Sequence, residues 1–257
     1  MVHFVGAGPG AEDLITLRGA RLIETADAII YAGSLVNPAL LSRARTDCEI
    51  FNSAEMTLEQ VIAVITAPER ASREIVRLHT GDSSIYGAVR EQMELLDAAG
   101  IDYDVCPGVS SFCGAASSLR AEYTLPGVSQ TVILTRMEGR TPVPEREEIS
   151  SLAAHGATMV IFLSTGMLDE LSRRLLLGGY ADDTPAAIVY KATWPDERIL
   201  RTTVGEMAAA ARDAGISKTA LVTVGNFLGG VHDRSKLYDP AFTTEFRQGT
   251  ATEQITE

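Results

Sequence analysis

Short apolar runs alternate with helical patterns along this chain, and no other feature constrains its fold as strongly. In the first half, runs of strand length lie near residues 2–7, 27–32, 48–51, 75–80 and 102–106, and helical patterns lie near 16–25, 57–67, 86–98 and 111–119. Thr57 with Gln60 matches a capping box, and Gly100 matches a helix stop. This alternation predicts a doubly wound α/β domain.

Residues 121–129, AEYTLPGVS, interrupt the alternation with Pro126 and Gly127. We place a domain boundary there, and expect one α/β domain over residues 1–122 and a second over 123–240. In the second domain, strands are expected near 130–136, 158–164, 186–192, 198–204 and 219–225, with helices near 145–154, 167–178 and 205–214. Some of the last strands have only short links, so part of this sheet should be antiparallel. Residues 241–257 are expected to form a flexible tail.

Composition and charge exclude several classes of protein. The longest apolar stretches, such as TMVIFLS and TALVTVG, are far shorter than the roughly 20 residues of a membrane helix, so we expect a cytoplasmic protein without membrane partners. The net charge of −12 argues against nucleic acid as a partner. The three cysteines and four histidines are scattered without metal-ligand spacing, so no metal site is expected.

Three glycine-rich loops follow the carboxyl ends of predicted strands in the first half. They are VGAGPGAED (5–13), LHTGDSSIYG (78–87) and CPGVSSFCG (106–114). In an open α/β sheet, ligands bind in the crevice beyond these strand ends, where glycine lets the backbone come close. The three loops therefore predict a ligand site.

The first loop, with Ala11, satisfies the relaxed dinucleotide fingerprint G-x-G-x-x-G/A. However, Pro9 interrupts it, and Glu12 and Asp13 place negative charge where a pyrophosphate would lie. The second predicted strand ends in Tyr31-Ala32-Gly33-Ser34 and so lacks the acid that binds a dinucleotide ribose. These residues argue against dinucleotide binding.

Several longer stretches identify a family resemblance. The combination GAGPG, LITLRGARLIETADAIIYAGSLVN, HTGDSSIYG and CPGVSSF resembles the tetrapyrrole methylases, S-adenosylmethionine-dependent methyltransferases of the cobalamin and siroheme pathways. The stretches YAGSLVNPALL, NSAEMTLE, RMEGRTPVPE and VYKATWPDE resemble the branch of this family that methylates carbon 11 of precorrin-4. The resemblance covers roughly residues 2–230.

The resemblance implies two α/β domains with the active-site cleft between them, and a homodimer. It implies transfer of a methyl group from S-adenosylmethionine to C11 of precorrin-4 or cobalt-precorrin-4, which leaves S-adenosylhomocysteine. Two alternatives stay open. One is a methyltransferase of the same fold that acts at another position, on precorrin-3B or uroporphyrinogen III; the other is a non-catalytic protein that binds the same cofactor.

The resemblance also carries cofactor contacts onto both halves of the chain. The expected cofactor-binding residues are Pro9, Thr80, Gly81, Asp82, Ile85, Ser110, Ser111, Met167, Ala192 and Ala220. Taken alone, Met167 at the start of a helical pattern would be read as a core residue.

The sequence also offers candidates for the substrate site and for the catalytic base. Because precorrins carry many carboxylates, an acidic enzyme needs local cations to bind them. The residues expected at the substrate are Gly8 and Gly10, which would leave room for a flat ring, and the cations Arg18, Arg136, Arg140 and Lys191. Candidates for the base that redistributes ring protons are Asp82, Glu122, Tyr123 and Glu138.

Overall fold

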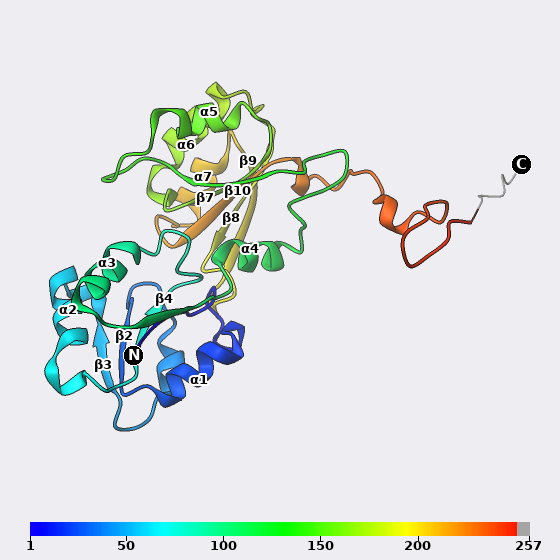
Figure 1. The fold of residues 1–257 in the computed structure, drawn as a ribbon. Coiled ribbons are helices and arrows are strands. Elements are labelled where there is room, and N and C mark those ends of the chain that lie inside the picture. The colour runs from blue at the N-terminus through cyan, green and yellow to red at the C-terminus, as the bar shows by residue number, and fades with distance from the viewer. Residues whose placement is uncertain (251–257) are drawn as a thin grey trace, which may run out of the picture. The chain divides into compact units, whose positions relative to one another are not determined.

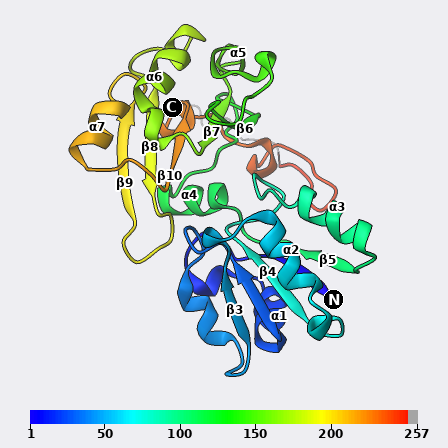
Figure 2. The same ribbon diagram turned by 90° about the vertical axis from the view of Figure 1, so that its left-hand side faces the viewer.

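The computed structural model describes residues 1–250 and divides into two compact units (Figures 1 and 2). Unit 1 contains Met1–Arg120, Val189–Ile199 and Lys218–Leu221, and unit 2 contains the rest of the described chain. The first continuous stretch of unit 1 therefore ends next to the expected boundary. Two later segments of the chain also belong to unit 1, so this unit is discontinuous.

Unit 1 is built on a parallel sheet of five strands in the order β3-β2-β4-β1-β5. The strands are β1 (Val2–Gly6), β2 (Ala28–Tyr31), β3 (Glu49–Asn52), β4 (Ile75–His79) and β5 (Tyr103–Cys106). The helices are α1 (Leu17–Thr25), α2 (Leu58–Thr66), α3 (Arg90–Ala99) and α4 (Ser111–Leu119). The predicted doubly wound pattern is confirmed in this unit.

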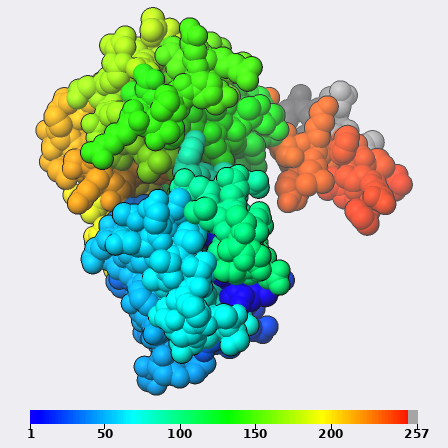
Figure 3. Space-filling model, turned by 60° about the vertical axis from the view of Figure 1, so that its left-hand side comes forward, coloured from blue at the N-terminus to red at the C-terminus, as the bar shows by residue number. Residues whose placement is uncertain are grey.

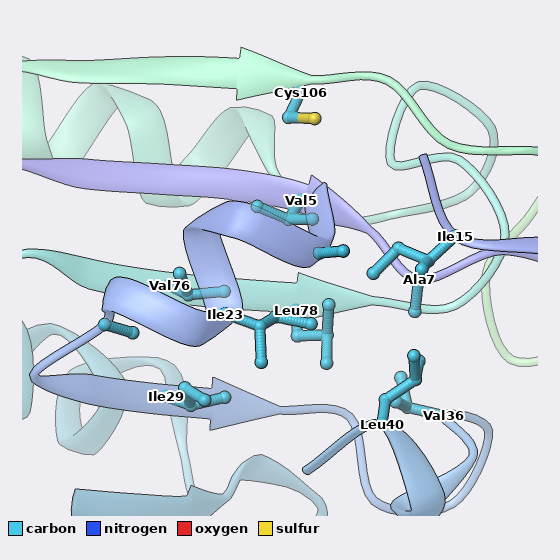
Figure 4. Close-up of a cluster of buried hydrophobic side chains, with 12 residues drawn as sticks. Val5, Ala7, Ile15, Ile23, Ile29, Val36, Leu40, Val76, Leu78 and Cys106 are labelled. Atoms are coloured by element: carbon cyan, nitrogen blue, oxygen red, sulfur yellow. The ribbon is translucent and has the colours of Figure 1, made fainter. Parts of the chain in front are cut away.

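Helices cover both faces of this sheet because successive strand residues point to opposite sides. Figure 4 shows one face, where Val5, Ile29 and Leu78 pack with Ile23 of α1. On the other face, a second buried cluster packs under α2 and α3; among its members are Phe4, Ile30, Ile75, Val61 and Leu96. Strand β4 is the central strand of the sheet and is packed on both faces, so the loop that follows it starts from a buried strand end.

Local signals explain where the helices of unit 1 begin and end. Thr57 accepts a hydrogen bond from the Gln60 N–H, and the Gln60 side chain accepts one from the Thr57 N–H, which confirms the capping box. Gly100 ends α3 in the left-handed conformation, as predicted. Helix α3 begins later than expected, because Tyr86 and Ala88 have φ of 55° and 48° and cannot continue a right-handed helix.

Unit 2 carries most of a second sheet of five strands, in the order β6-β7-β10-β8-β9. Its strands are β6 (Val132–Arg136), β7 (Thr158–Phe162), β8 (Pro185–Tyr190), β9 (Arg198–Thr203) and β10 (Ala220–Val224). Strand β7 pairs parallel with β6 and antiparallel with β10, which confirms the expected mixed sheet.

The helices of unit 2 are α5 (Ile149–Ala153), α6 (Leu168–Leu177) and α7 (Met207–Asp213). The helix expected over 145–154 is broken at Glu148, whose ψ of 157° is extended, so only its second part is α-helical. Within residues 1–250, no helix has the length and apolar character to cross a membrane. The predicted tail is described only up to residue 250, and its last residues, 251–257, lie outside the described part.

Candidate functional site

The loops after β1, β4 and β5 are in backbone contact at three glycines. A Cβ on Gly6 would lie 2.6 Å from the Cα of Gly108 and from the carbonyl oxygen of Gly81, closer than real Cβ atoms approach. Gly8 and Gly81 exchange backbone hydrogen bonds of 3.2 and 2.8 Å. The glycines are thus required for close packing, and the three predicted loops do meet at one edge of the sheet.

Asp82 fastens two of these loops together. Its Oδ2 accepts a hydrogen bond from the Gly108 N–H at 2.7 Å, and its Oδ1 accepts one from the Ser84 N–H at 2.9 Å and another from the Ser84 hydroxyl. Burial alone would raise the pKa of this carboxyl, but these hydrogen bonds outweigh burial and lower the pKa below 3.8. Asp82 is therefore ionised at neutral pH, and each of its oxygens accepts at least one hydrogen bond.

Residues 189–199, which follow much later in the chain, complete this loop cluster within unit 1. The Ala11 N–H donates to the Thr193 hydroxyl at 3.0 Å. The Trp194 indole fills the space at Gly10, and a Cβ on Gly10 would also lie 2.8 Å from the Ala192 carbonyl oxygen. The segment thus closes over the first glycine loop.

Glu197 anchors the same segment to α4. One of its carboxylate oxygens accepts hydrogen bonds of 2.5 Å from the Ser118 hydroxyl and from the Thr193 N–H. Gly114 of α4 in turn lets Pro9 approach, because a Cβ there would lie 2.7 Å from the Pro9 Cβ. Helix α4, the first loop and residues 189–199 therefore form one packed assembly.

Nine of the ten predicted cofactor residues belong to unit 1. These are Pro9, Thr80, Gly81, Asp82, Ile85, Ser110, Ser111, Ala192 and Ala220. Gly81 lies against the backbone of α4's first turn, where an added Cβ would be 3.3 Å from the Ser111 nitrogen. The tenth residue, Met167, precedes α6 in unit 2 and is half-buried. The ligand contacts of these residues stay predictions.

The predicted substrate residues differ in how they are engaged. Gly8 and Gly10 are buried by the chain itself. Lys191 pairs with Asp196 at 2.6 Å, and the Arg136 guanidinium donates to carbonyl oxygens of its own loop, residues 137–142. Two further cations, Arg18 and Arg140, are exposed. Of the four predicted substrate cations, Arg18 and Arg140 therefore have the charges that are most accessible to a ligand.

The other candidates for the base lie in unit 2. Glu122 is exposed and accepts a hydrogen bond from the Thr124 hydroxyl at 3.3 Å. Tyr123 is 8% exposed, with its ring edge-on to Phe227. Glu138 is paired with Arg174 at 3.0 Å. Nothing in these surroundings singles out one of them as the base.

A cavity of about 280 Å³ opens beside the predicted site, on the α2 and α3 side of unit 1. This face of unit 1 is drawn in light blue to blue-green in Figure 3. Thr80 and Ile85 line the cavity, and so do Arg77 and His79, which the predicted site does not include. The sequence does contain a signal for them: Arg77 and His79 are polar residues at alternate positions of the apolar run IVRLHT, and therefore lie on one face of the strand.

His79 and Arg77 are both buried, at 5% and 6% exposure. Burial, and secondarily the charge of Arg77, lower the pKa of His79 to about 3, so its imidazole is neutral at physiological pH. Burial also lowers the pKa of Arg77 to about 10, which leaves the guanidinium charged. Within residues 1–250, no three His, Cys, Asp or Glu side chains form a group that could hold a metal ion.

Comparison with known proteins gives a consistent family. The sequence profile of the Tetrapyrrole (Corrin/Porphyrin) Methylases matches residues 1–208. The chain is 51% identical to a cobalt-precorrin-4 C(11)-methyltransferase of Methanocaldococcus jannaschii, over 96% of each chain. It is 44% identical to a precorrin-4 C(11)-methyltransferase of Mycobacterium tuberculosis, over 88% of this chain and 91% of the relative. The structure of a cobalt-precorrin-4 methyltransferase, a cobalamin biosynthetic enzyme, superimposes with a TM-score of 0.86 at 44% identity, over 88% of this chain and 95% of that one.

Proposed function

This chain belongs to the tetrapyrrole (corrin/porphyrin) methylases, and from that premise we propose that it methylates C11 of precorrin-4 or cobalt-precorrin-4, with S-adenosylmethionine as methyl donor. The observation that carries the proposal is the identity of 51% to a C11-methyltransferase along nearly the whole of both chains. The enzyme is accordingly a C-methyltransferase of corrin-ring biosynthesis.

The glycine-locked loops suit a donor that carries no phosphate. Gly6, Gly81 and Gly108 let three backbone segments meet without side chains between them, and Asp82 fixes the loop that follows β4. The residues of unit 1 that would hold the donor are its nine predicted cofactor residues, and Met167 stays a predicted contact. When bound, S-adenosylmethionine supplies an electrophilic methyl group on a sulfonium.

The protein contributes mainly position and electrostatics to such a reaction. Methyl transfer needs carbon, methyl and sulfur in line, and a rigid loop cluster lowers the entropic cost of that alignment. We assign Asp82, whose two oxygens each accept a hydrogen bond, to holding Gly108 and Ser84 in place. Its hydrogen bonds support this assignment, and the base is left among Glu122, Tyr123 and Glu138.

The acidic substrate requires cations at the site, because the protein as a whole carries a charge of −12. Arg18 and Arg140 are exposed and are the predicted substrate cations with the least competition from the protein's own groups. We assign the first contact with substrate carboxylates to these two residues. From the family resemblance we also propose that the protein is cytoplasmic and forms a homodimer. Analytical ultracentrifugation tests the oligomeric state.

The deciding experiment offers the enzyme S-adenosylmethionine with a ¹³C-labelled methyl group, together with precorrin-4 or cobalt-precorrin-4 in parallel reactions. The proposal expects stoichiometric S-adenosylhomocysteine and a single new methyl resonance assigned to C11 by NMR. Transfer to another ring position would show a methylase of different regiochemistry. Cofactor binding without turnover of either substrate would show a non-catalytic protein.

A further inference from the structure

The cavity of unit 1 contains a buried cation that has no anionic partner. Arg77 donates from Nε to the Gln92 side-chain oxygen at 3.0 Å and from Nη1 to the Ile30 carbonyl at 3.1 Å. Within residues 1–250, no carboxylate oxygen lies within the 4.0 Å ion-pair distance of this guanidinium, and its Nη2 has no hydrogen-bond partner. The charge and one nitrogen of Arg77 are therefore left unsatisfied by the protein.

Other little-exposed arginines of this chain do have carboxylate partners. Arg70, whose side chain is 11% exposed, pairs with Glu49 at 2.8 Å. Arg174, at 17%, pairs with Glu170 at 2.7 Å. A buried charge without a counter-ion is costly to the fold. Arg77 lines the cavity, so an anion that enters the cavity could pair with its guanidinium and offset this energetic cost.

His79 supplies a second unsatisfied group at the same place. It lies two residues from Arg77 on β4, and therefore on the same face of the strand. Its Nε2 is buried and has no hydrogen-bond partner in the described chain. The ring is fixed by stacking on Phe4, with centroids 6.2 Å apart. A neutral imidazole carries one N–H, and in the Nε2 tautomer it donates to an acceptor in the cavity.

We propose that this cavity binds one side-chain carboxylate of the tetrapyrrole, held by Nη2 of Arg77 and Nε2 of His79. The inference rests on the proposed function, which supplies the class of substrate. A carboxylate matches a site that offers one cation and one neutral N–H, because charge-assisted hydrogen bonds from arginine to carboxylate are strong and directional.

The same chemistry could come from the amino-acid end of the methyl donor, so the two sources have to be separated. That end carries an ammonium group beside its carboxylate. Arg77 and His79 offer hydrogen-bond donors at the buried part of the cavity, and the one acidic residue in its lining, Glu91, is exposed. The arrangement therefore favours the tetrapyrrole carboxylate.

The test compares Arg77→Met and His79→Phe with wild type. His79→Phe keeps an aromatic ring on Phe4 and removes only the donor, so it covers the case in which Arg77→Met fails to fold. Arg73→Met is the matched control, since it removes a half-exposed arginine near the start of β4, away from the cavity. Thermal melts confirm folding before any binding constant is compared.

We expect Arg77→Met to raise the KM for the tetrapyrrole about tenfold or more, and His79→Phe to raise it several-fold. The dissociation constant of S-adenosylhomocysteine, measured by calorimetry, should stay within about twofold in both variants. An unchanged KM in the folded variants would overturn the subsite. Weaker S-adenosylhomocysteine binding with unchanged tetrapyrrole affinity would overturn it as well, by assigning the cavity to the donor.

A binding experiment without turnover keeps this inference separate from the proposed function. Uroporphyrin III and its fully esterified form are titrated into each protein and followed by their absorption spectra. Arg77→Met should weaken binding of the free acid about tenfold and leave that of the ester unchanged. Equal binding of the acid by wild type and Arg77→Met would overturn the subsite. Absence of methyl transfer by wild type would count only against the proposed function.

Discussion

The carboxylate of Asp82 accepts a hydrogen bond of 2.7 Å from the backbone N–H of Gly108, which lies 26 residues further along the chain. The bond joins the loop after β4 to the loop after β5, on either side of β1 in the sheet. A charged acceptor on a backbone donor is about twice as strong as a neutral one. This hydrogen bond therefore stabilises the packing of the two loops at the candidate site.

Replacing Asp82 by Asn should reduce the free energy of unfolding by about 1–3 kcal/mol. The carboxylate uses one oxygen for the Ser84 N–H and the other for the Gly108 N–H, whereas an amide has a single oxygen. In the Asn variant, the amide NH₂ group would therefore face one of these two backbone N–H groups. Urea unfolding measures the change. Asp13→Asn is the control, because Asp13 is exposed, and it should stay within about 0.5 kcal/mol of wild type. Equal losses in the two variants would argue against the fastening role.

Gly108→Ala should be strongly destabilising, because the new Cβ would lie 2.7 Å from the Gly6 Cα and would also press on the Gly81 carbonyl. Both neighbours are backbone, so neither can rotate away. We expect a loss of about 1–3 kcal/mol or more, seen as a lower Tm. Gly139→Ala is the matched control, since an added Cβ there meets nothing within 4 Å. A Gly108→Ala protein with wild-type Tm would refute the close packing of the three loops.

Glu197→Ala should cost about 1–3 kcal/mol of stability and weaken S-adenosylhomocysteine binding. The substitution leaves the Thr193 N–H and the Ser118 hydroxyl without this acceptor, which frees residues 189–199 from α4. Chemical unfolding and calorimetry measure the two effects. In the neighbouring control, Asp196→Ala, only an exposed pair with Lys191 is lost, and stability should change by less than about 1 kcal/mol. If the two substitutions behave alike, Glu197 is not the anchor.

Stability should depend on pH through His79. Its folded pKa of about 3 lies below the ordinary value of 6.5, so the unfolded chain binds the extra proton between these two values. The free energy of unfolding should therefore fall as pH drops below about 6.5, by on the order of 2 kcal/mol from pH 7 to pH 5. Comparing the pH slopes of wild type and His79→Phe isolates this contribution. The same slope in both proteins would show that His79 is not buried in its neutral form.

The order of strands and helices was predictable because their signals are local. The capping box at Thr57 and the helix stop at Gly100 both follow from residues within one turn. The late start of α3 was not predictable, since the left-handed conformations of Tyr86 and Ala88 are not apparent from residues of those types. Loop geometry of this kind is set by tertiary contacts.

The candidate site was predictable only in part, for a related reason. Glycine spacing pointed to the three loops, but the partner of Gly10 is the Trp194 side chain from a segment far along the chain. Arg77 and His79 were hidden in a strand, where an alternating polar residue usually marks a solvated face. Here that face is covered by α2 and α3, so the same pattern marks a cavity.

The return of residues 189–199 and 218–221 to unit 1 has a consequence during protein synthesis. The ribosome releases Met1–Arg120 long before Thr193, Trp194 and Glu197 exist, so the nascent amino-terminal sheet exposes a glycine loop that is not yet covered. The three glycine-rich loops therefore reach their final packing only after translation has passed residue 221.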